Sequence, residues 1–393
     1  MVPLLDITRL MSRAGRTLTG VDRVELAYLD RFLQEDQAFG LARTSLGYLV
    51  LNRDGLARFR DRTTSGDWGK VDPISRWSRR LDQYQKAAVS SVRADAVARV
   101  RRAGLAGMVR GLGVSDYFNV GHSNLEPKVL HALGRAGLRR HVFIHDTIPL
   151  DHPSWQRPGT VQRYRQKFNA AIQGADRILC NSAVTAKDII RHASGTVPPI
   201  TVAHLGVPVV TPAKTNPIAP DTHQDLAGAL PYFVTVGTIE PRKNHALLFD
   251  IWGAMQVYVG MPALHVCGPR GWNNADVFAR LDTGFGGHVV EMPGLSDADL
   301  AALLKGSRGL LFPSFAEGFG LPPIEAAALG VPVVCGDLAI YRETLGDLPI
   351  YLDPTDPYQW TKVIEELTAR PRTPKPFAPP TWEAHFKTVL SMA

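Results

Sequence analysis

Two carboxylates with a glycine-bearing turn between them are the residues of this 393-residue sequence best suited to chemistry. Glu317 and Glu325 stand eight residues apart, and Gly318 and Gly320 lie between them, where an apolar run meets a helical pattern. Glycines let a backbone approach a ligand closely, and a helix N-terminus presents unpaired N–H groups. A carboxylate about one turn inside the helix can accept hydrogen bonds from ribose hydroxyls. The run predicts a nucleotide-binding turn, with an ordinary strand–turn–helix joint as the alternative.

Two adjacent cations, Arg242 and Lys243, follow an apolar run and Gly237. Positive charge at this place can neutralise a diphosphate and stabilise it as a leaving group. An Arg-Lys pair in isolation is usually a solvated surface pair. The position of this pair beyond the carboxyl end of a predicted strand favours a ligand-binding role.

Further candidate positions follow predicted strands or begin a predicted helix. His145 and Asp146 end an apolar run, where a histidine either packs in the core or contacts a ligand. Gly20 stands before an amphipathic stretch, either as a helix-start glycine or as a point of close approach. Gly268 lies in a tight glycine loop, and Trp272 at its end either packs or contacts a ligand.

The elements that must position these residues alternate between strand-like runs and helical stretches, which predicts an α/β fold with parallel sheets. The first-half runs are Leu4–Ile7, Leu46–Leu51, Tyr117–Val120, His141–His145, Arg177–Cys180 and Ile200–Ala203. The second-half runs are Phe233–Val236, Leu264–Cys267, His288–Glu291, Gly309–Phe312, Val331–Cys335 and Ile350–Leu352. Ligands bind beyond the carboxyl ends of such strands, so we expect two Rossmann-like domains that face a cleft.

Proline-rich segments divide the sequence. Residues 211–230 are polar, carry three prolines and show no periodicity, so they predict a linker. Residues 371–380 hold five prolines, and an amphipathic helix is expected after them, over 382–392. We therefore expect an N-terminal domain over 1–210, a C-terminal domain over 211–378 and a separate C-terminal segment over 379–393.

The positive charge of the sequence is concentrated in one segment. Lys and Arg number 44 against 37 Asp and Glu, a net charge of +7, and residues 53–110 alone contribute +8. Within this segment 74–102 predicts a basic amphipathic helix, with an apolar stripe of Ile74, Trp77, Leu81, Tyr84, Ala88 and Val92. Such a helix either lies on an anionic membrane surface or packs on its domain with a solvated basic face. No recognised module supports nucleic-acid binding.

Composition also bears on location. No stretch approaches the roughly 18 consecutive apolar residues that a transmembrane helix needs. The first ten residues carry no basic run before their short apolar stretch, so a cleaved signal is not expected. The three cysteines are far apart, which argues against a disulfide framework and favours a reducing compartment. We expect a cytoplasmic protein that can be peripheral on the inner face of a membrane.

The run FPSFAEGFGLPPIEAAALGVPVV resembles the E-x7-E signature of family-four retaining glycosyltransferases, which have the GT-B fold. VGTIEPRKN, over 236–244, resembles the first loop of the family's donor domain, especially in its bacterial mannosyltransferase-like branch. VFIHDTIP, TGVDRV, PIYLDP and the helix from Trp382 also fit, in the expected order. Only residues 53–110 lack a counterpart. The resemblance implies that the last helix crosses back to the N-terminal domain.

The resemblance also implies roles for the candidate residues. Glu317, His145 and Asp146 would lie at the transferred sugar and form the catalytic group. The donor diphosphate would contact Arg242, Lys243, Gly20 and Gly237. The sugar and nucleotide would contact Gly318, Phe319, Gly320, Leu321, Glu325 and Gly268. The two cations adjoin here, whereas the family often separates them, so one of them can point elsewhere.

The expected reaction moves a sugar from a nucleotide-sugar donor to a hydroxyl of a bacterial glycan that can be lipid-linked. Resemblance to the mannosyltransferase-like branch favours GDP-mannose. Retention would follow from front-face displacement, in which the departing diphosphate takes the acceptor's proton, and double displacement through Glu317 stays open. No metal or other cofactor is expected, because Asp297 and Asp299 begin a predicted helix and are interpreted as caps.

Two other functions remain as alternatives. A nucleotide-sugar epimerase or a phosphorylase-like enzyme would use the same fold with different chemistry. A non-enzymatic binder of anionic surfaces would require a degenerate site, and the site residues are all present.

Overall fold

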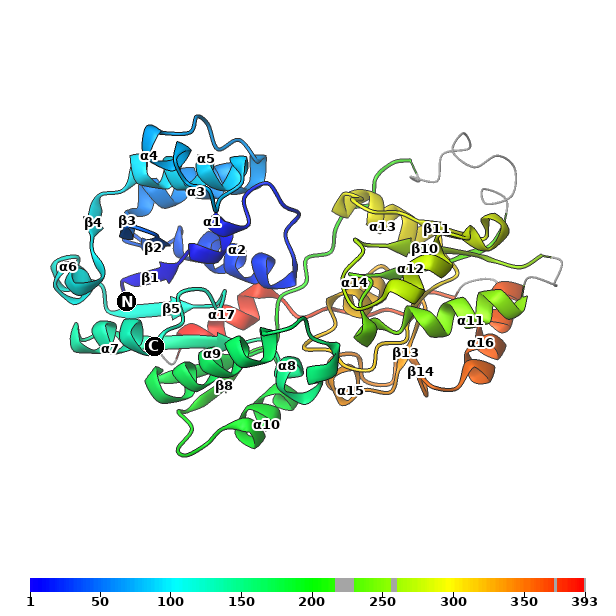
Figure 1. Ribbon diagram of the computed structural model, residues 1–393. Helices are drawn as coiled ribbons and strands as arrows, with labels where there is room; N and C mark the ends of the chain where they lie inside the picture. Colours follow the sequence, from blue (N-terminus) through cyan, green and yellow to red (C-terminus); the bar gives the residue numbers. More distant parts are fainter. Residues whose placement is uncertain (216–229, 256–259, 371–372, 392–393) are drawn as a thin grey trace. The chain divides into compact units, whose positions relative to one another are not determined.

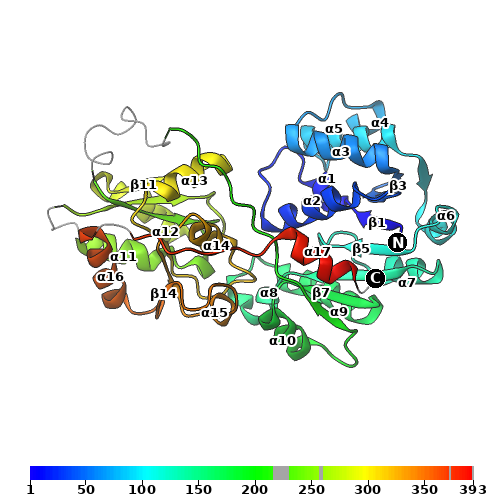
Figure 2. The same ribbon diagram turned by 180° about the vertical axis from the view of Figure 1, so that it is seen from behind.

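The computed structural model describes residues 1–215, 230–255, 260–370 and 373–391 (Figure 1). The chain forms two compact units, one of residues 1–147, 162–203 and 384–393 and the other of residues 148–161 and 204–383. Each unit holds its own sheet, covered by helices, and Figure 2 shows the same arrangement from behind. The predicted α/β class with two Rossmann-like domains is confirmed.

The described part of the first unit is built on an eight-stranded sheet of order β4-β3-β2-β1-β5-β6-β7-β8. The neighbouring strands β1, β5 and β6 are parallel, with Leu4 opposite Tyr117 and Phe118 opposite His141. The strand bounds are β1 Pro3–Asp6, β2 Phe39–Thr44, β3 Gly47–Leu51, β4 Ala98–Val100, β5 Asp116–Asn119, β6 Arg139–Ile144, β7 Arg177–Cys180 and β8 Ile200–Val202.

The first sheet is not purely parallel, which corrects the sequence prediction. Strand β3 runs antiparallel to β2, with Thr44 opposite Gly47, and β4 runs antiparallel to β3. Only two residues separate β2 from β3, and a loop of that length closes a hairpin, whereas a parallel connection needs a long crossover. The sequence interpretation missed β2 and therefore missed the hairpin.

Ten helices of the described chain belong wholly or mainly to the first unit. Their bounds are α1 Thr8–Ser12, α2 Gly20–Phe32, α3 Arg53–Ser65, α4 Pro73–Arg76, α5 Gln83–Asp95, α6 Leu105–Gly111, α7 Pro127–Arg135, α9 Thr160–Gly174, α10 Ala183–His192 and α17 Trp382–Leu390. Helix α17 reaches this unit from the far end of the chain. Its His385 Nε2 lies 3.0 Å from the Tyr28 hydroxyl of α2, and Phe386 packs edge-on against the Tyr28 ring.

The basic segment does not form one helix over 74–102, so that prediction is wrong. Helix α4 begins after Asp72, whose carboxylate caps it, and a new cap at Asp82 begins α5. Residues 98–100 leave the helical path and pair with β3. Two aspartates with strong capping propensity and a nearby strand edge therefore override the helical periodicity. Helices α3 and α5 pack on the β2–β3 hairpin (Figure 1).

The second unit holds a wholly parallel six-stranded sheet of order β11-β10-β9-β12-β13-β14 within its described residues. The strand bounds are β9 Tyr232–Val236, β10 Ala263–Cys267, β11 Val289–Glu291, β12 Gly309–Phe312, β13 Val333–Gly336 and β14 Ile350–Leu352. The helix bounds are α8 Ile148–Asp151, α11 His245–Met255, α12 Ala275–Leu281, α13 Asp297–Gly306, α14 Leu321–Ala328, α15 Ala339–Leu345 and α16 Pro357–Ala369.

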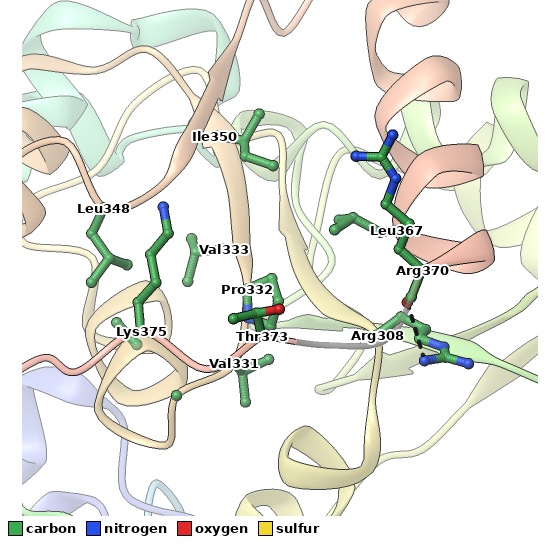
Figure 3. Close-up of a pocket in the computed structure, with 12 residues that line it drawn as sticks. Arg308, Val331, Pro332, Val333, Leu348, Ile350, Leu367, Arg370, Thr373 and Lys375 are labelled. Atoms are coloured by element: carbon green, nitrogen blue, oxygen red, sulfur yellow. Dashed lines mark hydrogen bonds between the residues drawn. The ribbon is translucent and has the colours of Figure 1, made fainter.

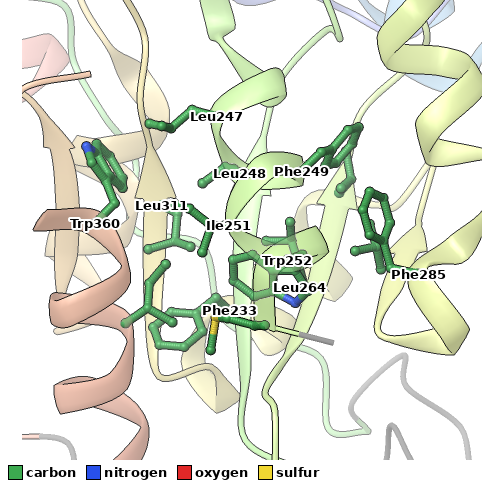
Figure 4. Close-up of a cluster of buried hydrophobic side chains, with 14 of the residues drawn as sticks. Phe233, Leu247, Leu248, Phe249, Ile251, Trp252, Leu264, Phe285, Leu311 and Trp360 are labelled. Carbon is green, nitrogen blue, oxygen red and sulfur yellow. The ribbon is translucent and has the colours of Figure 1, made fainter. Parts of the chain in front are cut away.

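A dense apolar cluster holds α11 and α16 against this sheet (Figure 4). Trp252 and Trp360 are fully buried in the cluster beside Phe233 and Leu311. The indole N–H of Trp252 donates to the backbone carbonyl of Pro262, and the indole N–H of Trp360 donates to that of Asp353. Because burial of large aromatic side chains is strongly stabilising and both polar atoms are satisfied, the cluster gives the sheet a rigid support.

The unit boundaries differ in two respects from the sequence expectation of 210. The second unit begins at 204, and it also takes residues 148–161. Trp272 holds that segment, because its indole N–H donates to the carbonyl of Trp155 and the Arg157 guanidinium lies 4.7 Å from its ring centroid. Residues 216–229 of the predicted linker and Met392 of the predicted last helix lie outside the described residues.

The strand order of the second unit creates a switch point. From β9 the chain moves to β10 and β11 on one side, and then returns to β12 on the other side of β9. In open parallel sheets ligands bind beyond the carboxyl ends of the strands at such a point. The loops after β9 and β12 are therefore the first place to look for a site.

Candidate active site

The loops after β9 and β12 are joined by direct contacts. The backbone N–H of Phe315 donates to the carbonyl of Arg242 at 2.8 Å, and Arg242 Nη1 donates to the carbonyl of Ala316 at 3.1 Å. The switch point therefore brings together two loops that lie more than seventy residues apart in sequence. The predicted diphosphate-binding cations and the E-x7-E turn are neighbours in space.

One carboxylate serves both cations. Glu317 Oε1 lies 2.6 Å from Lys243 Nζ and 2.7 Å from Arg242 Nη1. The side chains of Glu317 and Lys243 are each only 7% exposed, whereas that of Arg242 is 22% exposed. Arg242 Nε also pairs with Glu240 Oε1 at 2.7 Å, and Lys243 Nζ lies 4.2 Å from the centroid of the Phe312 ring.

The charges of this cluster follow from burial and pairing. Burial by itself raises the pKa of a carboxyl group, but the two cations outweigh it and lower the pKa of Glu317 to about 2. Burial lowers the pKa of Lys243 to about 8, against the opposing effect of Glu317. Pairing decides the pKa of Glu317, because this carboxylate has two cationic partners. Burial decides the pKa of Lys243, because the two cations share the Glu317 carboxylate and repel each other. At neutral pH both Glu317 and Lys243 are charged.

Glycines let the loops pass closely around this cluster. Gly237 has φ +130°, and Gly268 has φ +150°, where a Cβ atom would lie 2.2 Å from the carbonyl oxygen of Gly237. Gly320 begins α14 with φ +79°, and a Cβ atom there would lie 2.4 Å from Tyr341 Cε1. A side chain at Gly268 or Gly320 would require the loop to move.

The remaining predicted residues of the turn have different surroundings. Glu325 is half-buried on α14, and Leu321 is the first residue of that helix. The side chain of Phe319 is buried, with its ring 5.9 Å from that of His204. Phe319 can therefore offer a ligand its backbone, and its side chain supports the turn from within.

The other predicted residues belong to the first unit. Gly20 is exposed as the first residue of α2, which is capped by Thr19 and Asp22. His145 follows β6, is buried, and its Nε2 lies 2.7 Å from the carbonyl oxygen of Val120. Burial lowers the pKa of His145 to about 4, so its ring is neutral at pH 7. The backbone carbonyl of Asp146 accepts a hydrogen bond from the Tyr164 hydroxyl.

Three residues near these sites were missed by the sequence interpretation. Glu240 stands two residues before Arg242 in the motif itself, so its charge could have been noticed. Phe312 was placed in a strand, but its ring also contacts Lys243. His122 follows β5 as His145 follows β6, and the two ring centroids are 5.3 Å apart. The position of His122 shortly after a strand is the sequence feature that could have indicated it as a site residue.

The pocket shown in Figure 3 lies at the opposite edge of the second sheet. It is lined by residues just before or at the start of β12, β13 and β14, including Arg308, Val333 and Ile350. None of the predicted site residues lines it. The arrangement at the carboxyl edge, and not this pocket, carries the candidate chemistry.

Metal-ligand clusters and membrane-spanning helices are both absent from the described residues. No three His, Cys, Asp or Glu side chains among them gather as metal ligands, and Ser296 caps α13 by accepting from the N–H of Asp299. No helix in the same part of the chain is both long and apolar enough to cross a membrane.

Solved structures with the same architecture define the class. HepE from Anabaena, solved in complex with UDP and glucose, covers 100% of this chain at a TM-score of 0.63 and 14% identity, over 95% of its own length. The lipopolysaccharide outer core galactosyltransferase WaaB covers 100% of this chain at a TM-score of 0.58 and 14% identity, over 99% of its own length. The chain has the GT-B fold.

Sequence comparison finds relatives of part of the chain. Residues 222–378 match the family described as glycosyl transferases group 1. The serotype-specific mannosyltransferase WbdA of Escherichia coli is 31% identical over 257 residues, which cover 61% of this chain and 31% of that protein. The O-antigen chain mannosyltransferase B of Escherichia coli is 30% identical over 239 residues, 58% of this chain and 59% of that protein. The match with this chain spans about a third of the length of WbdA.

Proposed function

We propose that this protein is a retaining glycosyltransferase that moves mannose from GDP-mannose to a hydroxyl of a bacterial glycan. The observation that carries the proposal is the buried cluster of Arg242, Lys243 and Glu317 at the switch point of the second sheet. Two curated relatives named as mannosyltransferases support the choice of mannose. A lipid-linked acceptor is part of the proposal.

Arg242 and Lys243 would hold the donor diphosphate. The diphosphate would take over part of the pairing that Glu317 provides in the described structure. Two cations next to the leaving group neutralise the charge that develops as the glycosidic bond breaks. Arg242 and Lys243 would then neutralise the leaving diphosphate, a role that a metal ion has in other transferases. We therefore propose a metal-independent reaction.

Glu317 would act as a carboxylate. A group whose pKa is lowered to about 2 is ionised at neutral pH, so it does not serve as a general acid. A fixed negative charge beside the sugar stabilises an oxocarbenium-like transition state. Front-face displacement, with the diphosphate oxygen accepting the proton of the attacking hydroxyl, gives retention. Double displacement through Glu317 is the second route.

The decisive test uses the purified protein and a panel of nucleotide sugars without acceptor. We expect slow hydrolysis of GDP-mannose alone, with the α anomer of mannose appearing first by NMR. Glu317→Gln should abolish this release, whereas the control Arg370→Gln, which alters the pocket at the opposite edge, should keep it. A changed ring stereocentre in the intact donor would favour an epimerase. No binding of any donor would contradict the proposal.

We also propose that residues 74–84, here called the tip, attach the protein to an anionic membrane. Ile74, Trp77 and Tyr84 are 55%, 86% and 57% exposed, which is unusual for large apolar side chains so close in sequence. Arg76, Arg79 and Arg80 are exposed between them. In the described part of the chain none of these three arginines forms an ion pair. Aromatic side chains among free basic residues suit the interface of an anionic bilayer.

Vesicle sedimentation tests the tip. Arg79→Glu with Arg80→Glu should reduce binding to phosphatidylglycerol-containing vesicles at least about thirtyfold, because each basic residue contributes about 1 kcal/mol near such a surface. The matched control is Arg101→Glu with Arg102→Glu, an exposed pair of the same basic segment outside the tip. If both double variants lose the same amount of vesicle binding, the loss follows from net charge and not from the tip. If Arg79→Glu with Arg80→Glu binds vesicles as the unmodified protein does, the membrane proposal is wrong.

A further inference from the structure

The pocket at the amino ends of the strands in the second sheet has mainly apolar walls (Figure 3). It has a volume of about 240 Å³ and lies where β12, β13 and β14 begin and where α14 and α16 end. Ile350 is 38% exposed, so part of this apolar surface faces solvent. An apolar group that covers the walls would remove that surface from water, which is favourable. The walls are formed by Ala327, Gly330, Val331, Pro332, Val333, Leu348, Ile350 and Leu367.

Two cations border these walls. Arg308 directly precedes β12, and its Nη1 donates to the backbone carbonyl of Arg370 at 3.4 Å. A guanidinium group has five N–H donors, so this bond leaves most of them for a ligand. Lys375 is exposed, and among the described residues its ammonium group has no ion-pair or hydrogen-bond partner. In Figure 3 Lys375 borders the pocket on the side of Leu348, and Arg308 borders it on the other side.

No carboxylate of the described residues pairs with these cations. None of the twelve residues that line the pocket is acidic. Asp347, at its margin, is 98% exposed and lies 3.4 Å from Arg342. Glu366, one turn before Arg370 on α16, forms no ion pair in the described part of the chain. The exposed Arg370 side chain adds a third positive charge at the rim. The rim therefore has an uncompensated positive potential that attracts an anion.

The helix ends explain only part of this charge. A helix C-terminus carries partial negative charge and attracts cations, and the bond from Arg308 to the Arg370 carbonyl is of that kind. Lys375 makes no such bond to a described residue, although it lines the same pocket. A ligand with negative charge would give both cations a partner.

The size and polarity of the walls restrict the ligand. An apolar cavity of about 150 Å³ binds benzene, so this larger one has room for about six carbons with a head group at the rim. No lining residue is aromatic, so the walls offer no surface on which a nucleobase would stack. Thr373 supplies the one hydroxyl among the lining residues, so most hydroxyls of a sugar would lose their hydrogen bonds with water. These walls favour an alkyl chain.

We propose that the pocket binds a short-chain alkyl phosphate, with its phosphate on Arg308 and Lys375 and its chain against the apolar walls. A phosphate monoester carries about two negative charges at pH 7, which matches two cations. A guanidinium group can bind a phosphate through two parallel hydrogen bonds. The candidate active site lies at the opposite edge of the sheet, so this second site does not depend on the proposed function.

Isothermal titration of the full chain with hexyl phosphate tests the site, with and without saturating GDP. We expect one saturable site whose affinity GDP leaves unchanged. From butyl to hexyl phosphate the affinity should rise about fourfold for each added methylene, as burial of the chain predicts. Hexanol should bind at least about tenfold more weakly than hexyl phosphate, because it makes no hydrogen bonds through a charged group.

Substitutions locate the binding. Lys375→Gln alters an exposed side chain and should weaken hexyl phosphate binding about tenfold. Arg308→Gln should weaken it at least as much, and Arg308→Lys should restore part of the loss. The matched control is Lys362→Gln, since Lys362 is an exposed lysine of α16 that does not line the pocket. This control should bind hexyl phosphate as the unmodified protein does.

Four outcomes would overturn the proposal. The first is no binding of hexyl phosphate, and the second is an affinity that does not change with chain length. The third is displacement of hexyl phosphate by GDP, which would place it at the candidate active site. The fourth is an equal loss in Lys375→Gln and Lys362→Gln, which would assign the effect to net charge. Because the titration requires no turnover, a failure of donor hydrolysis would count against the proposed function alone.

Discussion

The carboxyl edges of the two sheets both pair arginine with a buried carboxylate, but in the second unit the carboxylate also holds a buried lysine. In the second unit Arg242 and Lys243 are neutralised by Glu317 and Glu240. In the first unit Arg9 shares its carboxylate with Arg13, and Lys167 has no ion-pair partner among the described residues. A carboxylate built into a site keeps buried cations charged and ordered without ligand. At the first edge Asp22 supplies that carboxylate for two arginines that are 27% and 24% exposed. The charges of the second edge are less exposed to solvent, so charge removal should cost more stability there.

The largest effect should follow from Glu317→Gln, which removes the shared carboxylate of the second edge. The change leaves two buried cations without their shared carboxylate and should destabilise the fold by about 3 kcal/mol, because an uncompensated buried charge is costly. Anomer release from the donor should fall at least about 100-fold, as the loss of one electrostatic contact to a transition state predicts. Calorimetry and the NMR assay measure the two effects. A fully stable variant would contradict the pairing described here.

The next effect concerns the backbone of the second edge. Gly320→Ala should destabilise the protein by about 2 kcal/mol and weaken donor binding, because a Cβ atom would overlap Tyr341 at a left-handed position. Gly286→Ala is the matched control, since Gly286 is also in the left-handed region (φ +66°, ψ +25°) but has no atom within 4 Å of the added Cβ. Denaturant unfolding should show a clearly smaller loss for Gly286→Ala. Equal losses would mean that the overlap with Tyr341 contributes nothing.

The pH dependence of the second edge should separate binding from stability. Lys243 loses its proton as the pH rises through about 8, so donor affinity should fall above that pH. The free energy of unfolding should not fall with the affinity. Between a pH of about 8 and the ordinary lysine pKa, Lys243 binds a proton in the unfolded chain but not in the folded protein. Its contribution therefore makes folding more favourable as the pH rises. Isothermal titration with GDP and thermal melts from pH 6 to 9.5 measure both. Lys243→Arg should lose the alkaline decline, and a decline that persists would assign it to another group.

At acid pH the Glu317 carboxylate changes stability in the same direction, since its contribution is also lost as the pH falls. The pKa of Glu317 is lowered in the folded protein, so the stabilisation by this group is present above the ordinary glutamate pKa. It should be lost as the pH falls from there towards about 2. Urea unfolding at pH 5 and pH 3 measures the loss, and Glu317→Gln should show a smaller difference between the two. An equal acid dependence in both proteins would place the effect elsewhere.

The sequence was most informative where a motif is local. The glycine turn before Glu325, the strand before Arg242 and the capping residue Ser296 all depend on neighbours within a few residues, and the structure has each of these elements as expected. The hairpin of β2 and β3 was missed because Phe39–Thr44 carries a weak pattern. The single helix over 74–102 was wrong because periodicity was given more weight than the capping aspartates at 72 and 82.

By itself the sequence determined the residue types, their order and the alternation of strands and helices, since these follow from side-chain chemistry over short spans. Only the tertiary structure decided that Glu317 meets both Arg242 and Lys243, and that the loop after β5 passes next to Arg9 at Gly121. Those pairings depend on which strands are neighbours, β9 beside β12 and β1 beside β5. Strand order is a property of the whole core, because many distant apolar contacts must be satisfied together before two loops can meet.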